Sequence, residues 1–175
     1  LGADFSRSER VSDLVGAGAR SDLLSVSMPL GEQVVDQRTL QKHKAAHATS
    51  DLLYKNALYD QTRTIFSGLI IVDEGAHYTD AYQTNRNLLN SQEAEANSMP
   101  GLEINADQVK CSHGATSAPV SNDELFYLKA RGIPDGEARK LIVLGFIEDT
   151  VTRIGNEAVE AMVCERIEEK FARVV

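Results

Sequence analysis

The feature that most constrains this chain is a change of pattern at Pro119. Before it, short runs of β-branched, aliphatic and aromatic residues stand between turn formers, as in Thr64-Ile65-Phe66 and Leu69-Ile70-Ile71-Val72. Runs of this kind predict strands. No helical period longer than about two turns interrupts them, which argues against βαβ units. After Pro119 the apolar residues recur at helical spacing.

Short strands joined by turns fit a sandwich, a barrel or a parallel β-solenoid. Polar residues within strand-like sequence favour the solenoid, because stacked rungs satisfy such side chains with hydrogen-bonded ladders. These residues are Thr79, Thr84, Asn85 and Asn87. The apolar pairs are unevenly spaced, so the sequence alone demonstrates no repeat.

Three helices are expected after Pro119. Ser121 and Glu124 fit a capping box at the start of the first helix, and Gly132 suits its end because Gly tolerates the left-handed conformation. Pro134 suits the first turn of the second helix. Its expected apolar face consists of Ala138, Leu141, Ile142, Gly145 and Phe146. The third helix would present Val159, Val163, Ile167 and Phe171 on one face.

Composition and charge exclude several classes of protein. Hydrophobic residues make up 42% of the 175 and charged residues 25%, which suits a folded core. The net charge of -8 argues against a nucleic-acid partner. No window approaches the run of about 20 apolar residues that spans a membrane. The first residues resemble no signal peptide and include no initiator Met, so we expect a fragment of a longer, intracellular protein.

Lys110-Cys111-Ser112-His113-Gly114 is the one segment with evident chemistry. In an extended chain Cys111 and His113 project from the same face. A thiolate and an imidazole are ligands for iron, zinc or an iron–sulfur cluster, and the imidazole could instead keep the thiol reactive. A metal site needs about four ligands, so a partner chain would have to supply the others. The plainer alternative is a buried Cys beside a hydrogen-bonded His.

The remaining candidates point to structural roles. His43 and His47 form an H-x-x-x-H pair, but no Glu follows His43 as in zinc proteases. His77 is expected in a surface turn, and Cys164 is expected to be a small buried hydrophobe of the third helix. No phosphate-binding loop, dinucleotide motif or nucleophile elbow is present, so we expect no ATPase and no self-contained active site.

Several long motifs in order resemble the SufB/SufD family of iron–sulfur cluster assembly proteins. The first is Asp80-Ala81-Tyr82-Gln83-Thr84-Asn85-Arg86-Asn87-Leu88-Leu89, and the resemblance continues through Pro100-Gly101-Leu102 and Leu125-Phe126-Tyr127. Ser112-His113-Gly114-Ala115 is similar to the SufD form of its motif, whereas SufB carries an HEA-type sequence there.

The resemblance implies a mainly β fold. This fold is a right-handed parallel β-helix over residues 1–118, followed by a small helical appendage over residues 119–175. It implies a non-catalytic subunit that pairs with SufB, binds the ABC-type ATPase SufC, and lies in the cytoplasm or a plastid stroma. A transient iron–sulfur cluster would form at the SufB interface, with His113 and, less firmly, Cys111 as ligands from this chain.

The helical segment would then dock on SufC. The residues expected to pack or make contact there are Leu125, Phe126, Tyr127, Arg131, Gly132, Ile133, Ala138, Leu141, Gly145 and Phe146. An alternative is that this face packs back on the β region.

Two other functions stay open: a secreted-type β-helix enzyme acting on polysaccharide, and a purely structural interaction module. A homodimer of the isolated chain is also open, because exposed β-helix edges readily pair.

Overall fold

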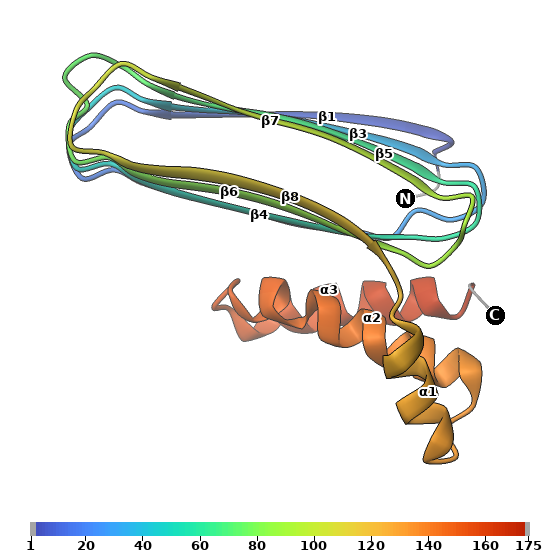
Figure 1. Cartoon of the computed structure of the whole chain (residues 1–175). Coiled ribbons are helices and arrows are strands. Elements are labelled where there is room, and N and C mark those ends of the chain that lie inside the picture. The colour runs from blue at the N-terminus through green and yellow to red at the C-terminus, as the bar shows by residue number, and fades with distance from the viewer. Residues whose placement is uncertain (1–2, 174–175) are drawn as a thin grey trace.

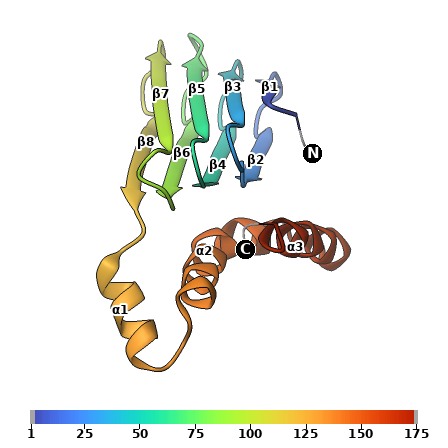
Figure 2. The ribbon, with the colours of Figure 1, turned by 90° about the vertical axis from the view of Figure 1, so that its right-hand side faces the viewer.

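The computed structural model describes residues 3–173 and shows a parallel β-solenoid of four turns, with three helices at its side (Figure 1). One four-stranded sheet has the order β1-β3-β5-β7 and the other β2-β4-β6-β8, so each turn contributes one strand to each sheet (Figure 2). The first sheet consists of β1 (Phe5–Leu14), β3 (Val34–His43), β5 (Arg63–Val72) and β7 (Glu95–Ile104). The second consists of β2 (Arg20–Ser27), β4 (Thr49–Leu58), β6 (Asp80–Leu89) and β8 (Lys110–Pro119).

The backbone of the solenoid repeats regularly from turn to turn, although the residue types do not. Phe5 pairs with Val34, 29 positions on, and Arg63 pairs with Glu95, 32 positions on. A left-handed residue stands two positions before each strand of the second sheet: Gly18, His47, Tyr78 and Gln108, with φ between 58° and 71°. Only the first of these is Gly. A search for regularly spaced glycines therefore finds no repeat, although the backbone repeats in every turn.

Both apolar and polar side chains fill the space between the two sheets. Phe66, Leu52 and Ile70 are fully buried, and so are Gln41, Gln83 and Asn85. The Asn87 carboxamide links neighbouring turns, because its Oδ1 accepts from Asn56 of β4 at 2.8 Å and its Nδ2 donates to the Ser117 hydroxyl of β8 at 3.2 Å. The ladder expected of polar residues in strand-like sequence is therefore present.

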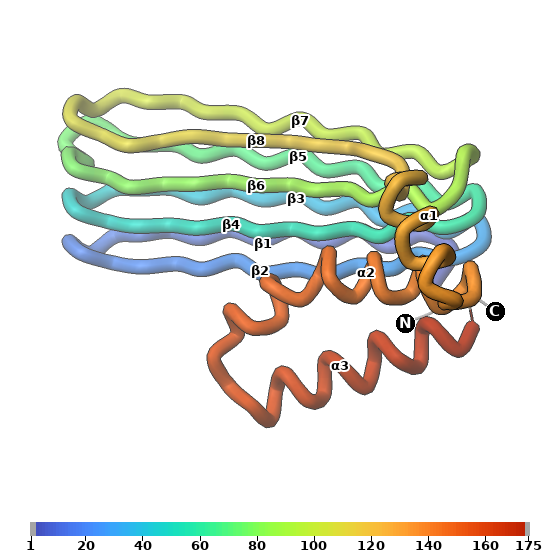
Figure 3. Tube along the Cα trace, turned by 60° about the horizontal axis from the view of Figure 1, so that its bottom comes forward, coloured from blue at the N-terminus to red at the C-terminus, as the bar shows by residue number. Residues whose placement is uncertain are grey.

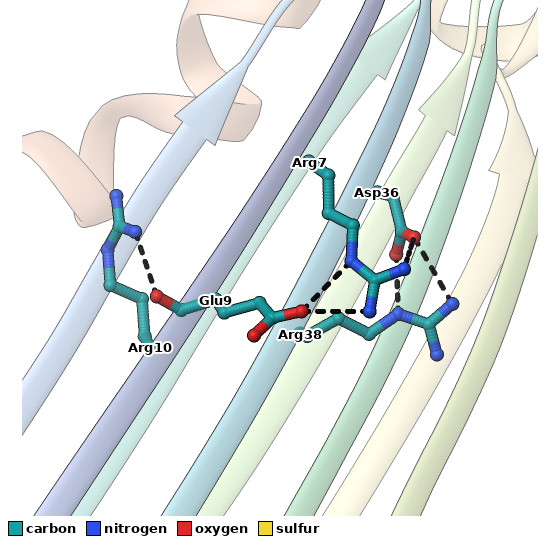
Figure 4. A network of polar contacts seen from close by, with 5 residues as sticks. All are labelled: Arg7, Glu9, Arg10, Asp36 and Arg38. Atoms are coloured by element: carbon teal, nitrogen blue, oxygen red, sulfur yellow. Dashed lines mark hydrogen bonds and ion pairs between the residues drawn. The ribbon is translucent and has the colours of Figure 1, made fainter.

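On the outer face of the first sheet, charged residues join the first two turns (Figure 4). The Asp36 side chain is 6% exposed and lies 2.6 Å from the Arg38 guanidinium. Arg7 approaches the same carboxylate at 3.7 Å and pairs with Glu9 at 2.8 Å. The two arginines compensate the buried charge of Asp36, as a carboxylate removed from water requires.

The helices begin and end close to the expected residues. α1 (Asn122–Ala130) is capped by the Ser121 hydroxyl, which accepts from the Glu124 N–H at 3.3 Å. Gly132 adopts φ 86° after it, and Pro134 directly precedes α2 (Asp135–Thr152). α3 is Glu157–Phe171. No helix among residues 3–173 is long and apolar enough to cross a membrane.

The buried face of α2 differs from the expected one. Val143, Ile147 and Val151 face the second sheet and pack with Met28, Ala57, Tyr59, Ile167 and Phe171. Leu141 and Gly145, expected on the apolar face, are exposed, whereas Ala138 is buried near Leu125. The reason is that α2 packs against β2 and β4 rather than standing apart from the solenoid (Figure 3). The division into units 1–118 and 119–175 stays a prediction.

Charge pairs hold α2 on β4. The Lys55 side chain is 4% exposed; its ammonium bonds the Asp149 carboxylate and the Phe146 carbonyl oxygen and lies 4.9 Å from the Phe146 ring centroid. Four residues along both elements, Arg153 pairs with Asp51 at 2.9 Å. The second pair is exposed and contributes little, whereas the first compensates a buried ammonium that would otherwise be left without a partner.

Candidate functional site

The candidate site lies at the open end of the solenoid, on β8. This strand pairs with β6 on one side only and forms the last turn together with β7 (Figure 2). Cys111 is in register with Ala81 and His113 with Gln83, and both β6 residues are buried in the interior. Cys111 and His113 therefore lie on the inward side of the strand, as expected from their spacing. Because no further turn covers β8 among the described residues, His113 is exposed.

Cys111 and His113 differ in environment. Cys111 is half-buried and packs on the apolar cluster of Ile70, Val72, Ala76 and Ala81. Burial raises the pKa of the Cys111 thiol, and the nearby Asp80 carboxylate raises it further. Both effects favour the neutral thiol, so the alternative of a thiolate kept reactive by the imidazole gains no support. His113 is the more accessible of the two groups.

The chain supplies only part of a metal-binding set. Within residues 3–173 no three His, Cys, Asp or Glu side chains are grouped closely enough to hold a metal ion. Imidazole and thiol are the right donor types for iron or an iron–sulfur cluster, but a cluster needs about four ligands. The donor types fit such a cluster, and the number of ligands fits only if a second chain completes the set.

The open end also offers a backbone edge. β7 and β8 are the terminal strands of their sheets, each ten residues long, and each carries unpaired hydrogen-bonding groups along its free side. Met99 and Ile104 on β7 are 59% and 43% exposed. A long exposed edge of this kind is a template for pairing with another strand.

The other candidates are not brought to this end. His43 is fully buried, its Nε2 lies 2.9 Å from the Ser50 hydroxyl, and burial lowers its pKa. His47 lies outside, where its ring stacks on Tyr78 with centroids 4.9 Å apart, so the pair cannot grip a metal. His77 is in an exposed turn, as expected. Cys164 is exposed rather than buried, because it lines an open groove between α2 and α3 instead of the core that holds Ile167.

A second candidate surface is the elbow between α1 and α2, formed by residues 122–139. Phe126 and Tyr127 are 74% and 55% exposed, and the Arg131 guanidinium lies 4.5 Å from the Tyr127 ring centroid. Asp135 bonds Lys129 and Arg139 at 2.8 Å each. Hydrogen bonds from these two cations lower the pKa of Asp135, which favours its ionised form.

The ten residues expected to dock on a partner divide into two groups. Leu125 and Ala138 are buried inside the chain, and Ile133 and Phe146 are half-buried against its core. The exposed ones are Phe126, Tyr127, Arg131, Gly132, Leu141 and Gly145. The expectation that this segment contacts a partner stays a prediction, and the exposed group is the part of it that is accessible.

Comparison with known proteins decides the family. Residues 1–146 match the model of the SufBD core domain of the SUF system for FeS cluster assembly. The chain belongs to the SufBD family. The match covers the solenoid, α1 and more than half of α2, so both candidate surfaces lie within it.

Curated SufBD relatives agree with the match. The chain is 35% identical over 171 residues to the iron–sulfur cluster assembly protein SufD of Escherichia coli, covering 98% of this chain and 40% of that protein. It is 31% identical over 163 residues to SufD of Bacillus subtilis, covering 93% of this chain and 37% of that protein. A SufBD family protein of Synechocystis is 35% identical over 154 residues. The chain thus spans about two-fifths of the length of these relatives or less.

Proposed function

We propose that this chain is the part of a SufD-type subunit that presents His113 to a SufB-type partner, within a complex that builds iron–sulfur clusters. The observation that carries the proposal is the position of His113: exposed, on the inward register of the last turn, beside a free strand edge. An imidazole at this position is accessible to a second chain, whereas the described part of its own chain supplies no further metal ligands close enough to complete a site. The cluster is the product of the complex and is held in passing.

The half-complete donor set determines what the partner has to bring. Cluster iron is usually bound by thiolates, and the only thiol near His113 in this chain is the neutral, half-buried Cys111. The partner would therefore supply cysteines opposite His113. Pairing of its strands along β7 or β8 would fix the distance between the two sets. A homodimer would bring two His113 side chains and two neutral thiols, a weaker set.

The α1–α2 elbow is the proposed docking surface for the ATPase SufC. The chain has no phosphate-binding loop, so ATP hydrolysis would take place in that partner. Exposed aromatic side chains such as Phe126 and Tyr127 are typical anchors of a protein interface. The subunit itself would be non-catalytic and would work in the cytoplasm. Family membership favours this role over a polysaccharide-acting enzyme or a module without a ligand.

The role of His113 is tested in the full-length protein co-expressed with its SufB and SufC partners. His113→Ala should abolish the cluster absorbance and the electron paramagnetic resonance signal of the reduced complex, while all three subunits still co-purify. Ser112→Ala is the matched control, since Ser112 is also exposed but is in register with Tyr82 on the outer side. A full cluster content in the His113→Ala complex would disprove the proposed role.

Docking of the ATPase is tested with Phe126→Ser and Tyr127→Ser in the same complex. These changes should release SufC and leave the SufB pairing intact. Met162→Ser is the control, because Met162 is 54% exposed on α3, away from the elbow. Retention of SufC by the double variant would place the ATPase elsewhere.

A further inference from the structure

An open groove runs between α2 and α3, separate from the elbow. The helices form an antiparallel hairpin beside the second sheet (Figure 3). The stripe of α2 that lines the groove includes Leu141, Gly145, Glu148 and Thr152, at spacings of three and four residues. The facing stripe of α3 includes Glu157, Glu160, Ala161, Cys164 and Glu168. Stripes with this spacing normally close a helical hairpin, but here they line an open channel.

The floor of the groove is apolar. Ile147, Val151 and Ile167 lie at its bottom and are already buried, at 7% exposure or less. The accessible apolar surface above them comes from Leu141, Leu144 and Ala161. Gly145 and Ala161 stand at the middle of the two stripes and leave the channel wide, with nothing within 4 Å of a Cβ placed on Gly145. Leu141 at one wall is 47% exposed. Leu141, Leu144 and Ala161 thus leave an accessible apolar strip above the buried floor, of the shape that accepts a helix.

The rim of the groove is acidic. Its lining includes Glu148, Glu157, Glu160 and Glu168, and no Lys, Arg or His. Glu168 is compensated by Lys140 at 2.6 Å at one end. Across residues 3–173, the other three carboxylates have no ion-pair partner within 4.0 Å. Three uncompensated carboxylates around an apolar floor select for a cationic ligand.

We propose that the groove binds a basic amphipathic helix of a partner protein, whose apolar face covers Leu141, Leu144 and Ala161 and whose Lys or Arg side chains reach the three free carboxylates. A second copy of this chain is a poorer occupant, since it carries the same acidic rim and a net charge of -8. The inference does not depend on the role of His113 or of the elbow.

The test is a titration of the purified chain with a labelled peptide of Leu and Lys, about 14 residues long, whose Leu residues recur at helical spacing. Fluorescence anisotropy should show saturable binding that weakens as salt is added, because salt screens charge pairs at a rim. The double variant Glu157→Gln, Glu160→Gln should weaken binding about tenfold. Neither change introduces strain, since both positions are exposed or half-buried on the helix surface.

The matched control is Glu165→Gln, Glu169→Gln, which removes the same charge from the same helix outside the groove. Binding by this variant should stay within about twofold of the original. An equal loss of peptide affinity in both double variants would show that only the net charge of the chain matters, and the proposal would be wrong. The absence of saturable binding would also overturn it.

Ala161→Trp provides a second test by filling the channel, with helix content checked by circular dichroism. It should abolish peptide binding while the helices stay intact. Undiminished binding by this variant would move the ligand out of the groove. A concentration-dependent dimer that Ala161→Trp dissolves in sedimentation would replace the basic helix with a second copy, and the proposal would be wrong.

Discussion

Gln83 occupies the space beside Gly68 that any larger residue at that position would need. A Cβ on Gly68 would lie 2.7 Å from Cδ of Gln83 and 2.7 Å from Cζ of Phe66. The Gln83 Nε2 donates to the Gly68 carbonyl oxygen at 3.3 Å. Gln83 is also the register partner of His113 on the neighbouring turn. The interior beneath the candidate site is therefore packed so closely around Gly68 that it leaves no room for a side chain there.

Gly68→Ala should lower the free energy of unfolding by about 1–3 kcal/mol, because overpacking a core forces its neighbours to move. Chemical denaturation measures the change. Gly136→Ala is the control: it adds the same methyl group to the first turn of α2, where nothing lies within 4 Å, and is expected to be neutral or stabilising. Equal stability of Gly68→Ala and the original would contradict the packing described. Adding Gln83→Ala to Gly68→Ala should restore part of the loss.

Asp149→Ala should destabilise the chain by about 1–2 kcal/mol, since it leaves the buried Lys55 ammonium without its carboxylate. The figure is below that of a fully buried pair because Asp149 is half-exposed. Lys55→Met should cost less, because it removes the buried charge altogether. A larger cost for Lys55→Met than for Asp149→Ala in denaturation experiments would contradict this.

The same pair predicts an acid dependence. Burial alone would raise the pKa of Asp149, but the hydrogen bond and charge of Lys55 outweigh burial and lower it. A carboxyl group with a lowered folded-state pKa contributes stability above its unfolded pKa of about 3.9 and loses it as the pH falls further. The difference in stability between Asp149→Ala and the original should therefore shrink below about pH 4. A constant difference down to the folded-state pKa would rule this out.

Tyr59 predicts an alkaline dependence. Burial raises the pKa of its phenol to about 12, partly opposed by Arg139. The folded state therefore disfavours the phenolate, so stability is complete below the unfolded pKa of about 10 and is lost as the pH rises toward the folded one. Tyr59→Phe should reduce this loss, and Tyr127→Phe, at an exposed position, serves as its control. The phenolate absorbance during an alkaline titration reports the ionisation directly.

Ile147→Ala should cost about 2–5 kcal/mol and Leu141→Ala less than about 0.5 kcal/mol. The first residue is 1% exposed in the cluster between α2 and the second sheet, and the second is 47% exposed. Thermal and chemical denaturation of both variants decide which face of α2 is buried. A larger cost for Leu141→Ala than for Ile147→Ala would favour the face expected from apolar spacing alone, and equal costs would contradict the packing described.

The fold could be predicted because local signals and family motifs agreed. The Ser121 cap, the left-handed Gly132 and the position of Pro134 fixed the helical elbow, and alternation placed Cys111 and His113 on one side of a strand. These features depend on neighbours in sequence. Which face of α2 is buried could not be predicted from neighbours in sequence, because Leu141 and Ile147 are equally apolar. Only the packing of the helix on β4 buries Ile147 and leaves Leu141 exposed.

The repeat and the groove were missed for a different reason. His47, Tyr78 and Gln108 share the left-handed backbone conformation, which residues of these types rarely adopt and which the sequence therefore does not predict. The groove stripes at Leu141, Gly145, Glu148 and Thr152 do follow helical spacing, and their mixture of apolar and acidic residues could have been noticed. Whether a hairpin closes across such stripes depends on packing between helices, which spacing does not determine.

Because strands pair turn by turn, each turn lengthens the solenoid by a fixed distance. α2 is anchored on β2 and β4, whereas His113 lies on β8, two turns further along. Adding or removing one turn between β4 and β8 would change the separation between the helical hairpin and the end that carries His113 by about 4.8 Å, the spacing of neighbouring strands. The number of turns thus sets the distance between the helical hairpin and His113, and with it the spacing of the two partners proposed above.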